Sequence, residues 1–321
     1  MNSTFLYIIT VLIWGSTWIA IKYQLGDVAS EVSIAYRFGL AAIILLAYCQ
    51  LKALRLRFSL RHHLQFFIFG VTLFSFNYYL LYSAQQHINS ALTCIAFSSI
   101  MFFNVFSARI WYGTKITQQV YLGGALGLLG IVTLFWPQIS DTHLGKETLL
   151  GLGLCIAGTM IASTGNMLSM KNQKLNLPLI PAMTWGMTYG AIFMAVVAMI
   201  QGRSFNFEVS FSYVSSLLYL AIFGSVIAFG SYLTLLNRIG AHQASYASIM
   251  FPAVAVIIST VVEDFAWTTY TFVGLAFILA GNLVVLARPK KQLLSDSCTE
   301  KHTYSAIQSN VNQAYLKTER L

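Results

Sequence analysis

The sequence is divided into long runs that contain no charged side chain. Arg61 and Arg109 enclose 47 residues without Lys, Arg, Asp or Glu, and residues 1–21 contain none either. A helix needs about 20 apolar residues to cross a bilayer, so the first of these runs has room for two spans. Charged residues make up 9% of the chain, against about 25% in soluble globular domains. The pattern predicts a polytopic membrane protein and excludes a soluble enzyme, a coiled coil and a disordered chain.

The uncharged runs predict an all-α fold with ten transmembrane helices. Strands of a membrane barrel would be alternating segments of about ten residues, whereas these runs are continuous. The first run is long enough to cross the membrane and no basic segment precedes it, so we expect a span rather than a cleaved signal peptide. The expected spans are residues 4–23, 32–51, 64–83, 90–110, 119–137, 148–170, 180–200, 211–235, 243–262 and 268–287.

Basic residues are distributed unevenly between the two sets of loops. Twelve Lys and Arg residues lie in loop 51–63, in later alternate loops and just after the last span, while the opposite loops hold only Lys22, Lys146 and Arg203. Cytoplasmic loops carry the excess of Lys and Arg, so we expect an inner-membrane protein with both termini in the cytoplasm. The net charge of +9 then reflects topology and lipid contact rather than nucleic-acid binding. Residues 291–321 are predicted to be a disordered cytoplasmic tail.

The two halves of the chain resemble each other. Residues 99–102 read Ser-Ile-Met-Phe and recur as residues 248–251, and Lys22 has a counterpart in Lys171 at the same offset of 149. Each half would hold five spans, and an odd number makes the second copy enter the membrane from the opposite side. This predicts two inverted repeats, residues 1–145 and 146–290, with a binding site between them near the bilayer midplane, as in many secondary transporters.

Short motifs, taken in order, resemble the EamA branch of the drug/metabolite transporter superfamily over about residues 4–290. They are Trp14-Gly15-Ser16-Thr17 followed by Lys22, Arg37-Phe38, Pro252, Glu263 and two glycines, Gly274 and Gly281. The resemblance implies a small-molecule carrier, often an exporter of amino acids or related metabolites. The chain departs from it in its first half, where Phe103 and Thr114 stand at the positions equivalent to Pro252 and Glu263.

Polar and aromatic residues near the middle of several spans predict a shared cavity. They recur with the 3.6-residue helical period, so they form stripes along single helix faces. Single Ser, Thr and Asn residues often join helices in lipid, but stripes on helices of both halves favour one common cavity. Aromatic rings with amides, which both donate and accept hydrogen bonds, suit a zwitterion. The candidate substrate-binding residues are Trp14, Trp18, Asn77, Tyr78, Tyr82, Asn166, Tyr232 and Ser248, of which Trp14, Tyr78, Asn166 and Tyr232 are expected to face one cavity.

Three residues are candidates for gating. Arg37 either extends to headgroups or pairs with Glu31 or Asp27, or it serves as a gate or a carboxylate contact. Lys22, at a helix end, either extends to the headgroups or takes part in a gate. Pro252 lacks a backbone donor and is expected to bend or break its helix, which frees a carbonyl near the cavity.

The sequence contains no arrangement typical of catalysis or of a cofactor site. No Asp or Glu falls at membrane depth, all six His residues fall in expected loops, turns or the tail, and no phosphate-binding glycine loop occurs. We therefore expect no enzyme activity, no metal and no cofactor. The predicted function is secondary transport of small metabolites, with amino acid export favoured, by a monomer or homodimer in contact with lipids. An oligomeric channel or facilitator pore for small uncharged solutes is the alternative.

Overall fold

The computed structural model describes residues 3–113, 118–140, 145–244 and 246–286. The chain divides into two units, Met1–Val285 and Leu286–Leu321, and the first of these holds all the elements discussed below. In the described ranges the regular elements are all helices, with no strand among them. The predicted tail and Thr114 lie outside the described residues.

Helices cover all ten of the expected spans. Among the described residues, seven segments are long and apolar enough to cross a membrane, and three shorter apolar segments, Tyr121–Pro137, Met250–Val262 and Thr269–Gly281, cover the other spans. The uninterrupted helices are α1 (Ser3–Lys22), α2 (Ser30–Leu51), α7 (Gln118–Ser140), α8 (Gly145–Lys174), α9 (Leu179–Ile200), α12 (Tyr246–Val262) and α13 (Thr269–Leu286). The interrupted ones are α3 (Leu60–Phe74) with α4 (Phe76–Ala84), α5 (Ser90–Phe97) with α6 (Ile100–Tyr112), and α10 (Phe211–Tyr219) with the π-helix η1 (Leu220–Ile227) and α11 (Ala228–Ala244).

Serine residues mark two of the interruptions, which the sequence analysis did not predict. Ser75, with φ −142° and ψ −87°, separates α3 from α4. Ser98 and Ser99 separate α5 from α6, and their hydroxyls donate to the carbonyls of Ile95 and Ala96 at 2.6 and 2.7 Å. Serine hydroxyls offer the backbone such local alternatives to the helical ladder. Pro252 does not break its helix, because α12 continues through that residue; a bend there stays a prediction.

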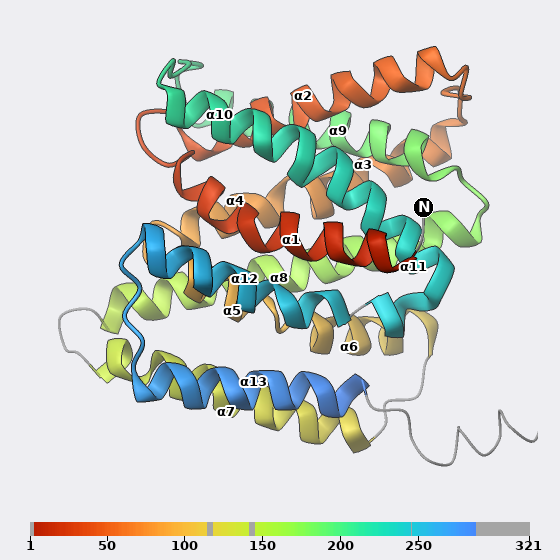
Figure 1. The fold of residues 1–321 in the computed structure, drawn as a ribbon. Coiled ribbons are helices and arrows are strands. Elements are labelled where there is room, and N and C mark those ends of the chain that lie inside the picture. The colour runs from red at the N-terminus through yellow and green to blue at the C-terminus, as the bar shows by residue number, and fades with distance from the viewer. Residues whose placement is uncertain (1–2, 114–117, 141–144, 245, 287–321) are drawn as a thin grey trace, which may run out of the picture. The chain divides into compact units, whose positions relative to one another are not determined.

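Helices from the two halves of the chain are interleaved. In Figure 1, α1 lies between α11 and α12, and α7 and α13 lie together. The first-half helix α2 likewise packs along α9 of the second half. The buried apolar core extends through both halves. A cavity inside this core is therefore walled by residues far apart in the sequence.

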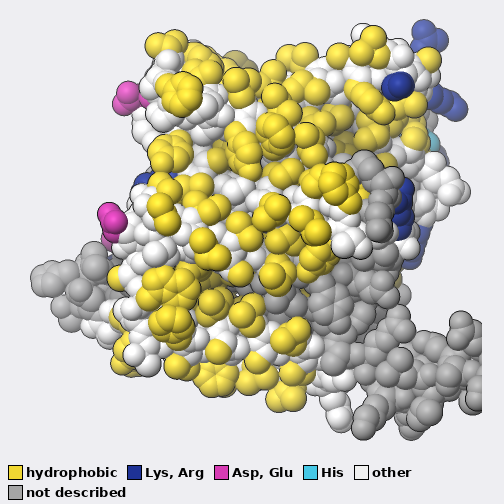
Figure 2. Space-filling model, in the orientation of Figure 1, with side chains coloured by type: hydrophobic (Ala, Val, Ile, Leu, Met, Phe, Trp, Pro, Cys, Tyr) yellow, Lys and Arg dark blue, Asp and Glu magenta, His cyan; other side chains and the backbone are white. Residues whose placement is uncertain are grey.

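Apolar side chains cover the outside of the helical unit. Figure 2 shows a broad hydrophobic surface, with most Lys and Arg side chains gathered at one edge and Asp and Glu at the opposite edge. Large apolar residues such as Leu129 and Ile192 are more than half exposed. A surface of this extent on a soluble protein would be unusual, and here it forms a lipid-facing band between two polar edges.

Close packing of α3 against α9 depends on glycine. A Cβ atom at Gly70 would lie 2.1 Å from the carbonyl oxygen of Gly186. We expect Gly70→Ala to lower the free energy of unfolding by about 1–3 kcal/mol, because the two backbones must separate. The thermal unfolding midpoint of the detergent-purified protein measures this. Gly153→Ala in α8, where nothing lies within 4 Å of the added Cβ, is the matched control, and an equal effect of both substitutions would contradict the packing argument.

Candidate functional site

A cavity of about 70 Å³ lies between residues of the first and second halves. One water molecule needs about 10–15 Å³ on this scale, so the cavity as it stands holds a few waters and must widen to admit a larger solute. Its walls come from α1, α3, α4, α5, α6, α8, α11 and α12. The lining residues are Trp14, Thr17, Trp18, Ile21, Leu73, Asn77, Tyr78, Leu81, Phe97, Ile100, Asn104, Ala162, Asn166, Phe229, Tyr232 and Phe251.

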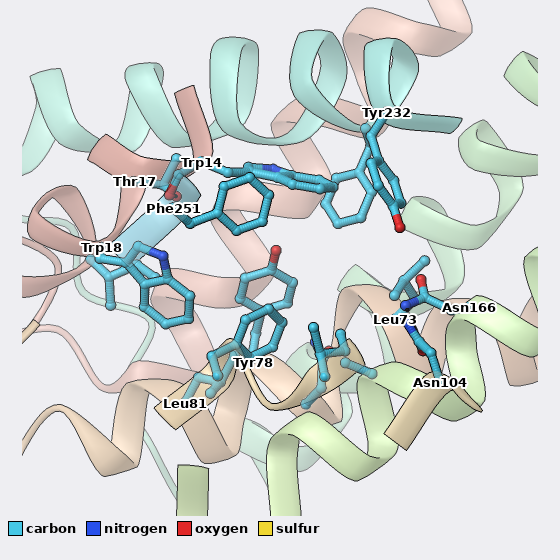
Figure 3. Close-up of a pocket in the computed structure, with 16 residues that line it drawn as sticks. Trp14, Thr17, Trp18, Leu73, Tyr78, Leu81, Asn104, Asn166, Tyr232 and Phe251 are labelled. Atoms are coloured by element: carbon cyan, nitrogen blue, oxygen red, sulfur yellow. Dashed lines mark hydrogen bonds between the residues drawn. The ribbon is translucent and has the colours of Figure 1, made fainter. Parts of the chain in front are cut away.

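Trp14 forms the centre of an aromatic wall. Its ring centroid lies 4.8 Å from that of Phe229, 5.0 Å from that of Tyr232 and 5.6 Å from that of Phe251. The indole N–H donates to the carbonyl of Gly224 at 3.1 Å, which fixes the ring. In Figure 3 this wall faces Tyr78 across the cavity. Aromatic faces of this kind offer a solute apolar contact and, toward a cation, attraction to the ring.

Amide side chains form the polar part of the lining. Asn166 donates from Nδ2 to Oδ1 of Asn104 at 3.2 Å, which joins α8 to α6 (Figure 3). Asn77 also lines the cavity, and its Oδ1 is buried without a hydrogen-bond partner. Amides supply both donors and acceptors, so this side of the cavity can meet either charge of a zwitterion.

The structure brings six of the eight candidate substrate-binding residues to the cavity: Trp14, Trp18, Asn77, Tyr78, Asn166 and Tyr232. Tyr82 does not line it and is fully buried, because it lies one helical turn beyond Tyr78, about 6 Å further along α4. Ser248 belongs to α12, but its side chain is outside the described residues. Substrate binding by these residues stays a prediction.

Two polar lining residues, Thr17 and Asn104, were not among the predicted site residues. Asn104 is the amide of the two. It stands alone between the apolar residues Phe103 and Val105, so it belonged to no polar stripe. An isolated amide within an apolar span was the available signal, since polar groups at membrane depth need a partner.

A charged cluster closes one end of the unit where α1, α5 and α12 meet. Lys22 Nζ lies 3.2 Å from Glu263 Oε1, and the Glu263 side chain is 5% exposed. Ser90 donates to the same carboxylate at 2.5 Å, and Ser259 donates to it as well. Burial alone would raise the pKa of Glu263, but the serine hydrogen bonds and Lys22 outweigh it and hold the pKa below its ordinary value of 4.5. The carboxylate therefore remains ionised at neutral pH.

Arg37 is buried inside the protein, with 1% of its surface exposed, so the expectation that it extends to the headgroups is wrong. Pairing with Glu31 or Asp27 is also wrong: Glu31 lies 3.7 Å from Arg203, and Asp27 is exposed. Arg37 instead donates from Nε to Ser225 Oγ at 3.1 Å.

The other two gating candidates are also placed by the structure. Lys22 joins the charged cluster with Glu263, and Pro252 is buried next to Phe251 of the cavity wall. Their part in gating stays a prediction. Among the described residues no three His, Cys, Asp or Glu side chains come close enough together to hold a metal ion.

Apolar helices long enough to span a membrane, around a cavity lined by aromatic rings and amides, define the class: an integral membrane protein with an internal cavity. The EamA-like transporter family model matches residues 1–136 and 149–287, and the chain belongs to this family. It is thus a membrane transporter, and its relatives place it in the inner membrane.

Relatives span most of the chain. The uncharacterised inner membrane transporter YedA of Escherichia coli strain K12 is 27% identical over 257 residues, 78% of this chain and 79% of that protein. A probable amino-acid metabolite efflux pump of the same strain is 20% identical over 284 residues, 86% of this chain and 92% of the other. A protein of known crystal structure matches with a TM-score of 0.65 at 16% identity, over 88% of this chain and 96% of that one. The structural match shows a shared fold.

Proposed function

We propose that this chain is a secondary transporter that moves small zwitterionic metabolites, above all amino acids, by alternating access. The observation that carries the proposal is the cavity, which is lined by residues of both halves and mixes aromatic rings with amides. A rigid-body movement of one half against the other would open such a cavity to each side in turn.

The proposed substrate class and direction rest on the lining and on one relative. The described cavity-lining residues include no carboxylate, so a cation would lack a counter-charge there, while amides can serve both ends of a zwitterion. The relative described as a probable amino-acid metabolite efflux pump supports amino acids as cargo and export as the direction.

The proposed architecture is two inverted five-helix repeats, residues 1–145 and 146–290, with both termini cytoplasmic. The family model matches once in each half, and the basic and acidic edges of Figure 2 agree with an uneven distribution of Lys and Arg across the membrane. Reporter fusions in loop 51–63 and in loop 201–210 test this. The proposal expects the two loops on opposite sides of the membrane, and the same side for both would contradict it.

The charged cluster of Lys22, Glu263, Ser90 and Ser259 is proposed to close the outer end of the cavity. It joins helix ends of the first half to the end of α12 in the second. A gate between halves must form and break during each cycle, and the half-exposed Lys22 at the polar edge can exchange its contact with Glu263 for water as the gate opens. The small volume of the cavity agrees with a closed conformation.

A flux assay with the purified full chain in proteoliposomes tests the proposed substrate class. Radiolabelled neutral, acidic and basic amino acids, polyamines and quaternary amines are offered with and without imposed pH and voltage gradients. We expect uptake of neutral amino acids and poor uptake of polyamines and quaternary amines. A protein that moves only the cations would contradict the proposal.

A further inference from the structure

Arg37 is a charged residue well inside the membrane-spanning part of α2. It lies seven residues after Ser30, roughly 10 Å along the helix at 1.5 Å per residue, and it is 1% exposed. Among the described residues no carboxylate forms an ion pair with Arg37; the nearest candidate on its own helix, Glu31, lies 3.7 Å from Arg203 instead. A charge at such depth is costly and typically serves a function.

The contacts of Arg37 satisfy its guanidinium group in part. Nε donates to Ser225, and the guanidinium carbon lies 4.5 Å from the ring centroid of Tyr78 and 4.9 Å from that of Phe38. These ring contacts attract the cation, but Nη1 is buried without a hydrogen-bond partner. An uncompensated buried cation of this kind is the arrangement that a bound anion would stabilise.

A further polar atom beside Arg37 also lacks a partner. α2 packs against α4, where Tyr82 Oη is buried without a hydrogen bond. Arg37 lies close enough to Tyr82 to act on it electrostatically. Buried polar atoms without partners in a native protein usually indicate water or an ion that completes the site. A hydroxyl that can donate, next to a positive charge, favours an anion.

The Arg37 group lies next to the cavity. Tyr78 lines the cavity, and the Arg37 guanidinium lies over the Tyr78 ring. Thr17 also lines the cavity. A Cβ atom at Gly224 would lie 2.9 Å from Thr17 Cγ2 and 3.4 Å from Arg37 Nη2, so both side chains approach Gly224. One layer of side chain therefore separates Arg37 from the cavity. The π-helix η1 carries both Gly224 and Ser225, and π-helical turns are frequent at functional sites.

We propose that the Arg37 guanidinium binds the carboxylate of the transported solute, so that a carboxylate group, rather than the amino group, is required for recognition. This rests on the proposed function and narrows it. Arginine presents a planar fork that matches a carboxylate with two parallel hydrogen bonds. Nη1, which has no hydrogen-bond partner, supplies one of these donors, and movement of Tyr78 or Thr17 admits the carboxylate.

Three probes that share a phenyl ring test the proposal: L-phenylalanine, 3-phenylpropionate and phenylethylammonium. The thermal unfolding midpoint of the full chain in detergent is measured with each probe at matched ionic strength, for wild type, Arg37→Met and Arg37→Lys. In wild type both carboxylate probes should raise the midpoint and phenylethylammonium should not. Arg37→Met should weaken carboxylate binding at least about tenfold, and Arg37→Lys, which keeps a point charge without the fork, should fall between.

The stability of the variant separates recognition from a structural role. Because Arg37→Met removes an unpaired buried charge and keeps a long side chain, the variant without probe should unfold at the same or a higher temperature. Arg61→Met, at an exposed position, is the control and should bind the carboxylates as wild type does.

Three results would each overturn the proposal. They are equal midpoint shifts in wild type and Arg37→Met, a shift with phenylethylammonium as large as with 3-phenylpropionate, and a wild type that no carboxylate stabilises. If Arg37→Met does not fold, the proposal is tested by comparing the midpoint shifts that the three probes cause in wild type and in Arg37→Lys. Failure of amino acid flux alone contradicts the proposed function, whereas Arg37-independent flux contradicts only the carboxylate assignment.

Discussion

Replacing Asn166 with leucine should lower the transport rate at least about tenfold without lowering the amount of folded protein. Leucine keeps the side-chain volume but removes the amide that donates to Asn104 at 3.2 Å, and it leaves Asn104 without this partner beside the cavity. A polar group of the solute that loses its hydrogen bond to the Asn166 amide costs about 1–3 kcal/mol, and 1.4 kcal/mol corresponds to tenfold. Uptake of a neutral amino acid by proteoliposomes measures the effect, with protein content determined after size-exclusion chromatography.

A control on the same helix separates the cavity from packing. Thr164 lies on α8 two residues before Asn166, does not line the cavity, and donates to its own helix at Met160. Thr164→Leu should leave transport near the wild-type rate. Tyr78→Leu, at another cavity position, should behave like Asn166→Leu. Unchanged transport by both cavity variants at matched expression would remove these residues from the proposed site.

Replacing Glu263 with glutamine should open the outer end of the cavity. Glutamine keeps the shape of the side chain but loses the charge that attracts Lys22 at 3.2 Å, and it weakens the hydrogen bonds from Ser90 and Ser259. Removing one partner of a largely buried charged group destabilises it by more than 1.4 kcal/mol in typical cases. A single cysteine at Thr17, in a variant without the four native cysteines, should then react at least about tenfold faster with a membrane-impermeant thiol reagent applied from outside.

The pH dependence of this labelling follows from the sign of the pKa shift. The pKa of Glu263 is lowered in the closed conformation by its serine partners and Lys22, despite its burial. Because its pKa is lowered, ionised Glu263 stabilises the closed conformation at every pH above its ordinary pKa of 4.5. This stabilisation is lost as the pH falls through the lowered pKa. Each rate is divided by that of the denatured protein at the same pH, because the reactive thiolate fraction falls with pH. On this relative scale, labelling of wild type should stay slow from pH 8 to about 5 and accelerate below 4.5, while Glu263→Gln should be fast throughout. Equal rates for the two proteins at pH 7 would contradict a closing role for the cluster.

Hydrophobic run length and helical period were sufficient to predict the spans and much of the cavity lining. Trp14 and Trp18 share a helix face at a spacing of four, and both line the cavity. Asn104 was missed because its partner, Asn166, lies on another helix, and one sequence does not reveal which helices are neighbours. The interruption at Ser75 has no Gly or Pro to mark it. The burial of Arg37 depends on its contacts with Ser225 and Tyr78, which lie on other helices. The positions of the spans along the sequence do not predict such contacts.

Counterflow tests the central claim, that this chain carries its solute by alternating access through the cavity. Proteoliposomes with the full chain are loaded with a high concentration of unlabelled neutral amino acid and diluted into a trace of the same labelled compound. The account predicts a transient accumulation of label above equilibrium, because a carrier returns across the membrane with solute bound, and a reduced accumulation with Asn166→Leu. Uptake that rises only to equilibrium, with the same rate whether or not the vesicles are loaded, would indicate a pore and contradict the account.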